Sequence, residues 1–260
     1  MKWQGFVLPV GATMLAEAAA RAFGIQSDSL ASPSQILGAA WGLLRDGALF
    51  AMLGQTLLAA FGGLLIGGGA GVVMALVLGL SPTISKLLRL PIEGLRPIPA
   101  IAILPVFLMV FGFGYRLEIA DVSFACFWPS LIIGQAAISG IEPRLLDVSR
   151  VLGLGFWGRV TKIVIPAALP RLFVAFRLAA AVALIVAVTV EIALNPQGMG
   201  YELMSAQSSL RPEVMFAILL YIGITGWSVN AALLLAQRRL FGRAGGMHVG
   251  MLGGVAGEPP

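Results

Sequence analysis

The sequence predicts an all-α integral membrane protein with six transmembrane helices, and both composition and patterning indicate this class. Of the 260 residues, 58% are hydrophobic and only 11% are charged, which is more apolar surface than a soluble domain can keep out of water. The 33 glycines fit the same class, because glycine is tolerated in membrane helices and lets backbones approach closely. The apolar residues form uncharged runs of about 20 residues, the length that spans a bilayer as a helix.

The six predicted spans cover residues 5–25, 54–80, 97–114, 122–141, 173–194 and 214–237. The first of them could instead be a cleaved signal peptide. Lys2 precedes the first apolar run, and small residues at 16–20 are spaced as in a cleavage site. Glu17 and Arg21, however, are placed to pair on one helix face, which favours a retained helix.

The second and third spans carry irregularities. Residues 47–85 carry no charge, and this stretch is longer than one straight span needs. We therefore predict that the part before residue 54 lies at the membrane interface. Within span two, small residues recur every four positions and predict close helix packing, either inside this subunit or against a second one: Ala59, Gly63, Gly67, Gly71, Ala75 and Gly79. Pro97, Pro99 and Pro105 predict a third span that is kinked or has a non-helical entry.

The distribution of basic residues predicts that both termini are cytoplasmic. Six spans place the two termini on one side, and the segments on that side hold most of the Lys and Arg residues. The opposite side holds only Arg21, Arg45, Arg116 and Arg211. This asymmetry matches the positive-inside rule. Residues 1–241 form the predicted transmembrane domain, and the Gly-rich tail, 242–260, is predicted to be disordered.

Several classes of function are excluded by what the sequence lacks. The basic residues are scattered through short loops rather than gathered in a patch, so nucleic acid is not an expected partner, whereas membrane lipid is. The single histidine, His248, lies in the tail, and the single cysteine, Cys126, lies in an apolar run. We therefore expect no metal site, no cofactor and no catalytic residues.

One polar loop between spans four and five stands out, residues 147–170. Glu142 and Pro143 predict the start of a short amphipathic helix, which Gly153 and Gly155 end. A second short helix is predicted from Phe156, with Pro166 at its end and Pro170 in the first turn of span five. Such a pair of helices can rest on lipid headgroups or dock on a protein, and periodicity alone leaves both open.

This loop resembles the cytoplasmic signature of permease subunits in binding-protein-dependent ABC importers, E-A-A-x3-G-x9-I-x-L-P. Gly153, Ile163 and Pro166 stand at the positions of its glycine, isoleucine and proline. The departures are Asp147-Val148-Ser149 in place of E-A-A and Ile165 in place of leucine. The segments 32–37, 95–114 and 198–207 are similar to the taurine, alkanesulfonate and nitrate branch of that family.

The resemblance implies a multi-pass permease of the bacterial inner membrane, paired with a second permease subunit as a homodimer. It implies a cytoplasmic ABC ATPase dimer and a periplasmic or lipid-anchored binding protein as partners. The loop would be the coupling helix that docks on the ATPase, through Asp147, Arg150, Gly153, Phe156, Trp157, Ile163 and Pro166. The chain has no G-x-x-x-x-G-K-[ST] loop, so it is expected not to be an enzyme and to leave ATP to its partner.

Charged residues in or near the spans are candidates for the solute route, because a charge in the hydrocarbon core is costly. Glu191, near the end of span five, and Tyr201, in the following loop, are predicted to belong to the translocation pathway or its gate. Arg177 is predicted to extend to the membrane surface, and Asp121 to be a solvated helix start. The implied solute is small and anionic, organic or inorganic. The alternative function is a secondary transporter or channel that works without an ATPase.

Overall fold

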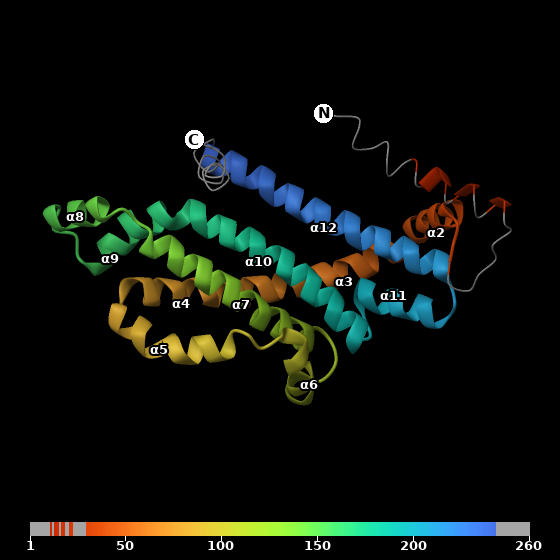
Figure 1. The fold of residues 1–260 in the computed structure, drawn as a ribbon, viewed down its shortest axis with the longest axis horizontal. Helices are drawn as coiled ribbons and strands as arrows, with labels where there is room; N and C mark the ends of the chain where they lie inside the picture. Colours follow the sequence, from red (N-terminus) through yellow and green to blue (C-terminus); the bar gives the residue numbers. More distant parts are fainter. Residues whose placement is uncertain (1–10, 12, 16, 19–20, 23–29, 243–260) are drawn as a thin grey trace, which may run out of the picture. The chain divides into compact units, whose positions relative to one another are not determined.

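The computed structural model describes residues 11, 13–15, 17–18, 21–22 and 30–242, apart from the side chains of Leu146 and Arg150. In this part of the chain every element is a helix (Figure 1). The elements are α2 (Pro33–Arg45), α3 (Ala48–Gly63), the π-helix η1 (Leu64–Gly68), α4 (Gly69–Leu80), α5 (Pro82–Leu95), α6 (Ala100–Phe111), α7 (Tyr115–Ser139), α8 (Pro143–Val151), α9 (Phe156–Arg159), the π-helix η2 (Val160–Val164), α10 (Ile165–Ala193), α11 (Gly198–Ser208) and α12 (Pro212–Phe241).

Four helical runs of the described residues are long and apolar enough to cross a membrane: Ala48–Leu80, Tyr115–Ser139, Phe156–Ala193 and Pro212–Phe241. The pair α5 and α6 passes the same test together, although the two helices are bent by 92° at their junction. The structure thus has four candidate spans, or five with the bent pair, in its described part. The predicted span at 5–25 and the tail at 243–260 lie largely or wholly outside the described residues.

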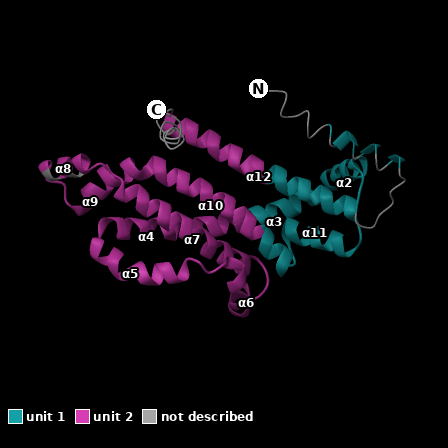
Figure 2. Ribbon diagram, viewed as in Figure 1, with its two compact units in different colours: residues 1–58, 188–225 teal, residues 59–187, 226–260 magenta. Residues whose placement is uncertain are grey.

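The chain forms two compact units (Figure 2), one made of residues 1–58 and 188–225 and the other of residues 59–187 and 226–260. The core of the first unit joins α3, α11 and α12 through the buried side chains of Leu49, Met52, Met199 and Ile218. The second unit has two cores. One joins α4 to α7 and α10, and the other places alanines of α10 against Leu64, Val122 and Cys126.

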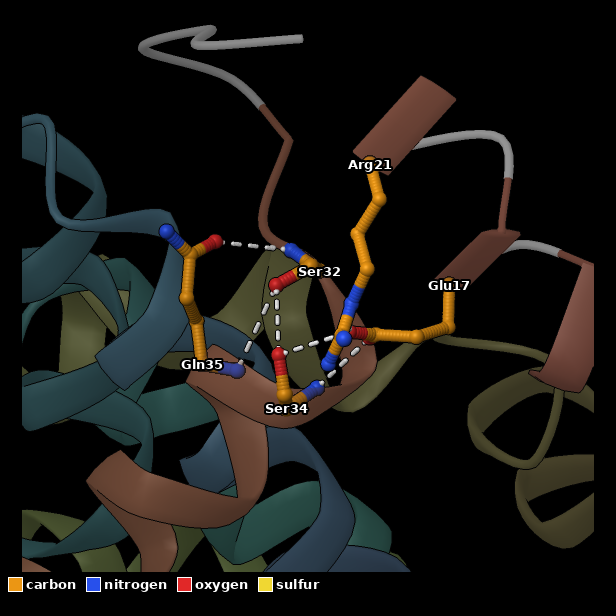
Figure 3. Close-up of polar contacts among 5 residues, drawn as sticks. All are labelled: Glu17, Arg21, Ser32, Ser34 and Gln35. Carbon is orange, nitrogen blue, oxygen red and sulfur yellow. Dashed lines mark hydrogen bonds and ion pairs between the residues drawn. The ribbon is translucent and has the colours of Figure 1, made fainter. Parts of the chain in front are cut away.

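At the start of α2, Glu17 and Ser32 hold the first turn (Figure 3). The Ser32 hydroxyl accepts a hydrogen bond from the Gln35 amide, and the Gln35 side chain accepts one from the Ser32 amide, which is a capping box. Glu17 accepts hydrogen bonds from the amide and the hydroxyl of Ser34. The predicted pair of Glu17 and Arg21 is confirmed, with 2.7 Å between Oε1 and Nε.

The small residues of span two pack inside the chain, which decides between the two possibilities left by the sequence. A Cβ atom added at Gly63 would lie 2.5 Å from Val122, one at Gly71 would lie 2.5 Å from the carbonyl oxygen of Phe127, and one at Gly79 would lie 2.6 Å from Ile138. These distances are too short for any side chain, so the glycines allow α7 to pack directly against the backbone of α3 and α4. Glycines further along α3 and α4 meet residues further along α7, so α4 and α7 run parallel.

The helix boundaries differ in part from the predicted spans. The helix that begins at Ala48 continues through η1 to Leu80 without a break, so the stretch before residue 54 belongs to the same helix as span two, and its place at the membrane interface stays a prediction. Pro170 lies inside α10 rather than in its first turn, since α9, η2 and α10 form one continuous run. The non-helical entry to span three is confirmed: α5 ends at Leu95 and α6 begins only at Ala100, whereas Pro105 lies inside α6.

Candidate functional site

The segment after α10 turns back on itself and begins a new helix, α11, whose N-terminus faces polar side chains. The first amide groups of a helix have no partner within the helix, so they need acceptors from elsewhere. Here three consecutive amides each find a side chain: Gly198 donates to Gln55 Oε1 at 2.9 Å, Met199 to Thr56 Oγ1 at 3.0 Å, and Gly200 to Glu191 Oε2 at 2.8 Å. We call this arrangement the α11 cap.

The α11 cap fixes three elements of the same unit to one another. Gln55 and Thr56 come from α3 and Glu191 comes from the last turns of α10. The Thr56 hydroxyl also donates to the carbonyl oxygen of Met52 at 3.1 Å, so it is used as donor and acceptor. Thr56 is fully buried and Glu191 is 1% exposed. In such surroundings these hydrogen bonds have little competition from water, which makes their loss expensive.

Two glycines enclose the Glu191 carboxylate. Gly198 has a φ of +86°, a conformation that residues with side chains rarely adopt, and a Cβ atom there would overlap the carboxylate of Glu191. A Cβ atom at Gly200 would lie 2.7 Å from the Cβ atom of Glu191. The carboxylate therefore sits against the positive end of the α11 dipole, where a negative charge is stabilised. Only glycine fits at both positions.

A cavity of about 410 Å³ opens beside the α11 cap. Its lining includes Glu191 and Tyr201, the two residues predicted for the pathway or gate, together with Ser205, Ser208 and Ser209. Tyr201, which contributes to this lining, is 40% exposed. The structure brings the two predicted residues together at one cavity, and their role in transport stays a prediction.

One of the two other charged residues of the spans lies differently from the prediction. Asp121 is 1% exposed and lies inside α7, which begins at Tyr115, so it is not a solvated helix start. Neither of its carboxylate oxygens has a hydrogen-bond partner in the described part of the chain. The Nη1 of Arg177 donates to Gln237 Oε1 of α12 at 3.2 Å, and the predicted extension of Arg177 to the membrane surface stays a prediction.

The polar loop forms an elbow, which we define as α8, α9 and η2. As predicted, α8 begins at Pro143 and ends just before Gly153, which has a φ of +63°. The amide of Leu154 donates to the carbonyl oxygen of Ser149 at 3.0 Å, which is the bond that closes a Schellman motif around a left-handed glycine. Gly153 therefore sets the angle at which the chain leaves α8.

After the elbow's turn, the helix does not stop at Pro166, contrary to prediction. The residues Phe156–Ala193 form one helical run, and the π-helix η2 lies directly before this proline. Proline has no amide to donate, and the amide of Ile165 instead bonds the carbonyl oxygen of Val160, five residues earlier. The wider turn accommodates Pro166 within the helix. The elbow is consequently continuous with a membrane-spanning helix.

Large apolar side chains are exposed on the elbow. Phe156 is 59% exposed and Trp157 is 74% exposed, and their rings meet edge to face with centroids 5.5 Å apart. Val151 and Leu152, at the end of α8, are 87% and 65% exposed. Asp147 and Pro166 are also exposed, whereas Ile163 is half-buried beside the fully buried Val164. Arg150 lies in α8, and its side chain is outside the described part of the structure.

Gln55 and Thr56 are the residues of the α11 cap that the sequence did not predict. They are neighbouring polar residues in a long uncharged, apolar helix, and this isolation is the signal that could have found them. A polar side chain inside a spanning helix needs a partner. Their partners lie far away in the sequence, however, so the pairing itself becomes visible only in the fold.

Comparisons with known proteins agree with the geometry. The sequence profile of the family described as "Binding-protein-dependent transport system inner membrane component" matches residues 67–245. The permease SsuC of Bacillus subtilis (strain 168), named for aliphatic sulfonates transport, is 28% identical over 76% of this chain and 72% of its own. The taurine transport system permease protein TauC of Escherichia coli (strain K12) is 29% identical over 74% of this chain and 68% of its own. The nitrate import permease protein NrtB of Leptolyngbya laminosa is 26% identical, over 76% and 75%.

The fold also resembles a solved transporter. Inward-facing crystal structures of the MetNI methionine ABC transporter include a chain that superposes with a TM-score of 0.61 at 19% identity, covering 81% of this chain and 99% of that one. At this identity the likeness concerns the fold alone. Together with the profile match over most of the chain, it shows that the protein belongs to the family of inner membrane components of binding-protein-dependent transport systems.

Proposed function

We propose that this chain is the membrane-spanning permease subunit of an ATP-driven importer and forms the route for a small anionic solute. The elbow carries the proposal. It presents two adjacent aromatic side chains on a short helix that runs without a break into α10, a candidate span. An exposed aromatic pair on a membrane protein's loop fits a pocket on a partner, where truncation of a Trp side chain often costs about 2 kcal/mol or more of binding free energy.

The elbow has the properties of a mechanical link. A partner that changes shape with its nucleotide state can move a spanning helix only if the connection between them is stiff. Gly153 and the Schellman bond fix the angle between α8 and α9, and the helix continues from η2 into α10, which contains Pro166. The partner supported by this geometry is a cytoplasmic ABC ATPase dimer, which binds the ATP. The permease itself then needs no cofactor and performs no catalysis.

The remaining partners follow from the family. We infer a second copy of this permease across the route and a binding protein that delivers the solute on the opposite side of the membrane from the elbow. Relatives named for sulfonates, taurine and nitrate support a solute that bears a sulfonate or a comparable oxyanion. The cavity lined by Glu191 and Tyr201, beside the α11 cap, is then part of the gate on the binding-protein side.

Copurification tests this proposal. The tagged permease, expressed together with its candidate ATPase and binding protein, should be isolated as a stable complex. Its ATP hydrolysis should rise when liganded binding protein is added. A permease that is isolated without any ATPase, and that catalyses solute uptake alone in vesicles, would show instead a secondary transporter or channel.

A further inference from the structure

The helix α5 carries charged residues on one face and nowhere else. Lys86, Arg89, Glu93 and the helix-ending Arg96 are all exposed and are spaced by three or four residues. At 3.6 residues per turn, they fall within an arc of about 80°. We call them the polar face of α5. Arg89 and Glu93 form an ion pair at 2.8 Å, and no ion pair involves Lys86 or Arg96 in the described residues. Three cations and one anion leave this face positive.

The side of α5 next to Arg96 packs into the bundle. Leu88 and Ile92 pack against the core that contains Ala75 and Leu78 of α4, so α5 folds back beside α4 (Figure 1). Ser85 Oγ accepts a hydrogen bond from Gln135 Nε2 of α7 at 3.1 Å. These contacts place α5 beside α4, and the hydrogen bond of Ser85 joins its first turn to α7. An amphipathic helix that only rested on the membrane surface would not be packed in this way.

The hydrogen bond to Gln135 gives the depth of the polar face. Gln135 is four residues from the end of α7 at Ser139, and Arg96 lies eleven residues beyond Ser85. At 1.5 Å per residue, α5 carries Arg96 about 16 Å past Ser85, away from that end of α7. The hydrocarbon core of a bilayer is about 30 Å thick. The backbone of Arg96 therefore lies well inside the depth that α4 and α7 cross.

Charged side chains at this depth do not face lipid. Each would cost about 2.5–3.5 kcal/mol in the hydrocarbon core, so the polar face must meet water or protein. Leu87, on the side of α5 that points away from the polar face, is 75% exposed, and Leu90, on its flank, is 80% exposed. These leucines supply the surface for lipid. Lipid headgroups remain at the membrane surface and cannot follow α5 inward to Arg96.

We propose that the polar face of α5 lines a water-filled part of the solute route and attracts oxyanions such as sulfonates. This inference rests on the proposed function and adds to it the residues that select the charge of the solute. Arg96, the deepest cation, presents a planar guanidinium that can donate two parallel hydrogen bonds to one oxyanion. Arg89 is partly neutralised by Glu93, so Lys86 and Arg96 contribute most of the net field.

Charged thiol reagents test the proposal without knowledge of the solute. The chain has a single cysteine, Cys126, so Cys126→Ser provides a cysteine-free background. In that background, Glu93→Cys places a thiol among the three cations, and Gln207→Cys on α11 serves as an exposed control outside both the polar face and the cavity beside the α11 cap. The complete complex, in vesicles of phosphatidylcholine, is treated with 2-sulfonatoethyl methanethiosulfonate or its cationic trimethylammonium analogue. Lys86→Cys provides a second position if Glu93→Cys assembles poorly.

At position 93, the ratio of the reaction rate with the anionic reagent to the rate with the cationic one should exceed the same ratio at the control position by about tenfold or more. A charged cleft concentrates its counter-ion by such factors. Adding Arg96→Gln should reduce this preference severalfold, while Leu87→Cys should react with neither reagent. No reaction at positions 93 and 86, or no preference for the anion, would overturn the proposal. So would reaction at Leu87→Cys, which would place all of α5 in water.

Two further measurements separate the alternatives. If phosphatidylglycerol in the vesicles slows the anionic reagent at position 93, the face binds lipid headgroups and the proposal is wrong. ATP hydrolysis of the same complexes, measured in parallel, reports on the proposed function independently. A complex that hydrolyses ATP in response to the binding protein but shows no anion preference would contradict only the role of α5.

Discussion

The carboxylate of Glu191 occupies the space that a side chain at Gly198 would need. Gly198 is in the left-handed conformation, and its amide bonds Gln55 while the amide of Gly200, two residues on, bonds Glu191 at 2.8 Å. The glycines and the acidic residue are thus one unit of structure, which holds the start of α11 against α10 and α3. This arrangement makes the consequences of single substitutions specific.

Two substitutions of Glu191 should destabilise the protein to different degrees. Glu191→Ala leaves the buried amide of Gly200 without an acceptor, which costs about 1–3 kcal/mol. Glu191→Gln keeps an acceptor and loses only the charge at the helix N-terminus, a smaller effect of about 0.3–1 kcal/mol. Thermal unfolding in detergent should rank the variants in this order. Glu202 is exposed on α11, so Glu202→Gln is the control and should unfold like the wild type. Equal stability of Glu191→Ala and Glu202→Gln would show that the α11 cap is not formed.

A side chain at Gly198 should be more disruptive than one at most other glycines. Gly198→Ala forces a left-handed alanine into the carboxylate of Glu191, so we expect a lower melting temperature and reduced uptake. Gly223→Ala in α12 is the matched control, because nothing lies within 4 Å of its added Cβ atom. In a helix interior alanine is favoured over glycine by about 1 kcal/mol, so this control should be neutral or more stable. Tolerance of Gly198→Ala with a normal melting temperature would contradict the described conformation.

The close approach of α4 and α7 predicts a contrast between neighbouring glycines of one helix. In Gly71→Ala the new methyl group meets the backbone of Phe127 at 2.5 Å, and the two helices must separate, at a cost of about 1–3 kcal/mol for overpacking. In Gly69→Ala the methyl group meets nothing within 4 Å. Comparison of the two melting temperatures checks the packing directly. A Gly71→Ala variant as stable as Gly69→Ala would mean that the stripe faces something other than α7.

Hydropathy and local signals predicted a large part of the fold. The long apolar runs correspond to α3 with α4, α7, α10 and α12, and the limits of α8 follow from Pro143 and Gly153, which act on their own backbone. Hydropathy placed the start of the span that contains α7 at residue 122, seven residues after the helix begins, because Asp121 was interpreted as a charge at the membrane surface although it is buried in the helix together with Glu118. Their burial depends on neighbours that a window of sequence does not contain.

The candidate sites, likewise, could be predicted only where their residues lie close together in the chain. The residues of the elbow could be predicted, since the glycine, the aromatic pair and the prolines are close together in the chain. The continuity of the elbow with α10 could not be predicted, because a proline predicts the end of a helix. The π-helix that accommodates Pro166 has no sequence pattern that would reveal it. The α11 cap joins Gln55 and Thr56 to amides that lie more than a hundred residues away. Only the fold brings such partners together.

The angle of the elbow should matter for transport but not for insertion. Gly153→Asp puts a side chain at a φ of +63° and adds a charge where the elbow would meet its partner. We expect normal amounts of permease in the membrane and loss of most solute uptake. Immunoblots of membranes together with uptake assays measure the two quantities separately. If Gly153→Asp transported solute at the wild-type rate, the fixed turn at the end of α8 would have no part in coupling.

The most direct test of the account compares two exposed tryptophans. Trp157 on the elbow and Trp227 on α12 are 74% and 72% exposed, so truncation of either should leave the fold intact. In reconstituted vesicles with ATPase and binding protein, Trp157→Ala should lose ATP-driven uptake, and the binding protein should no longer stimulate ATP hydrolysis. Trp227→Ala should behave like the wild type. Full uptake and full stimulation in Trp157→Ala would show that the elbow does not connect this permease to its source of energy.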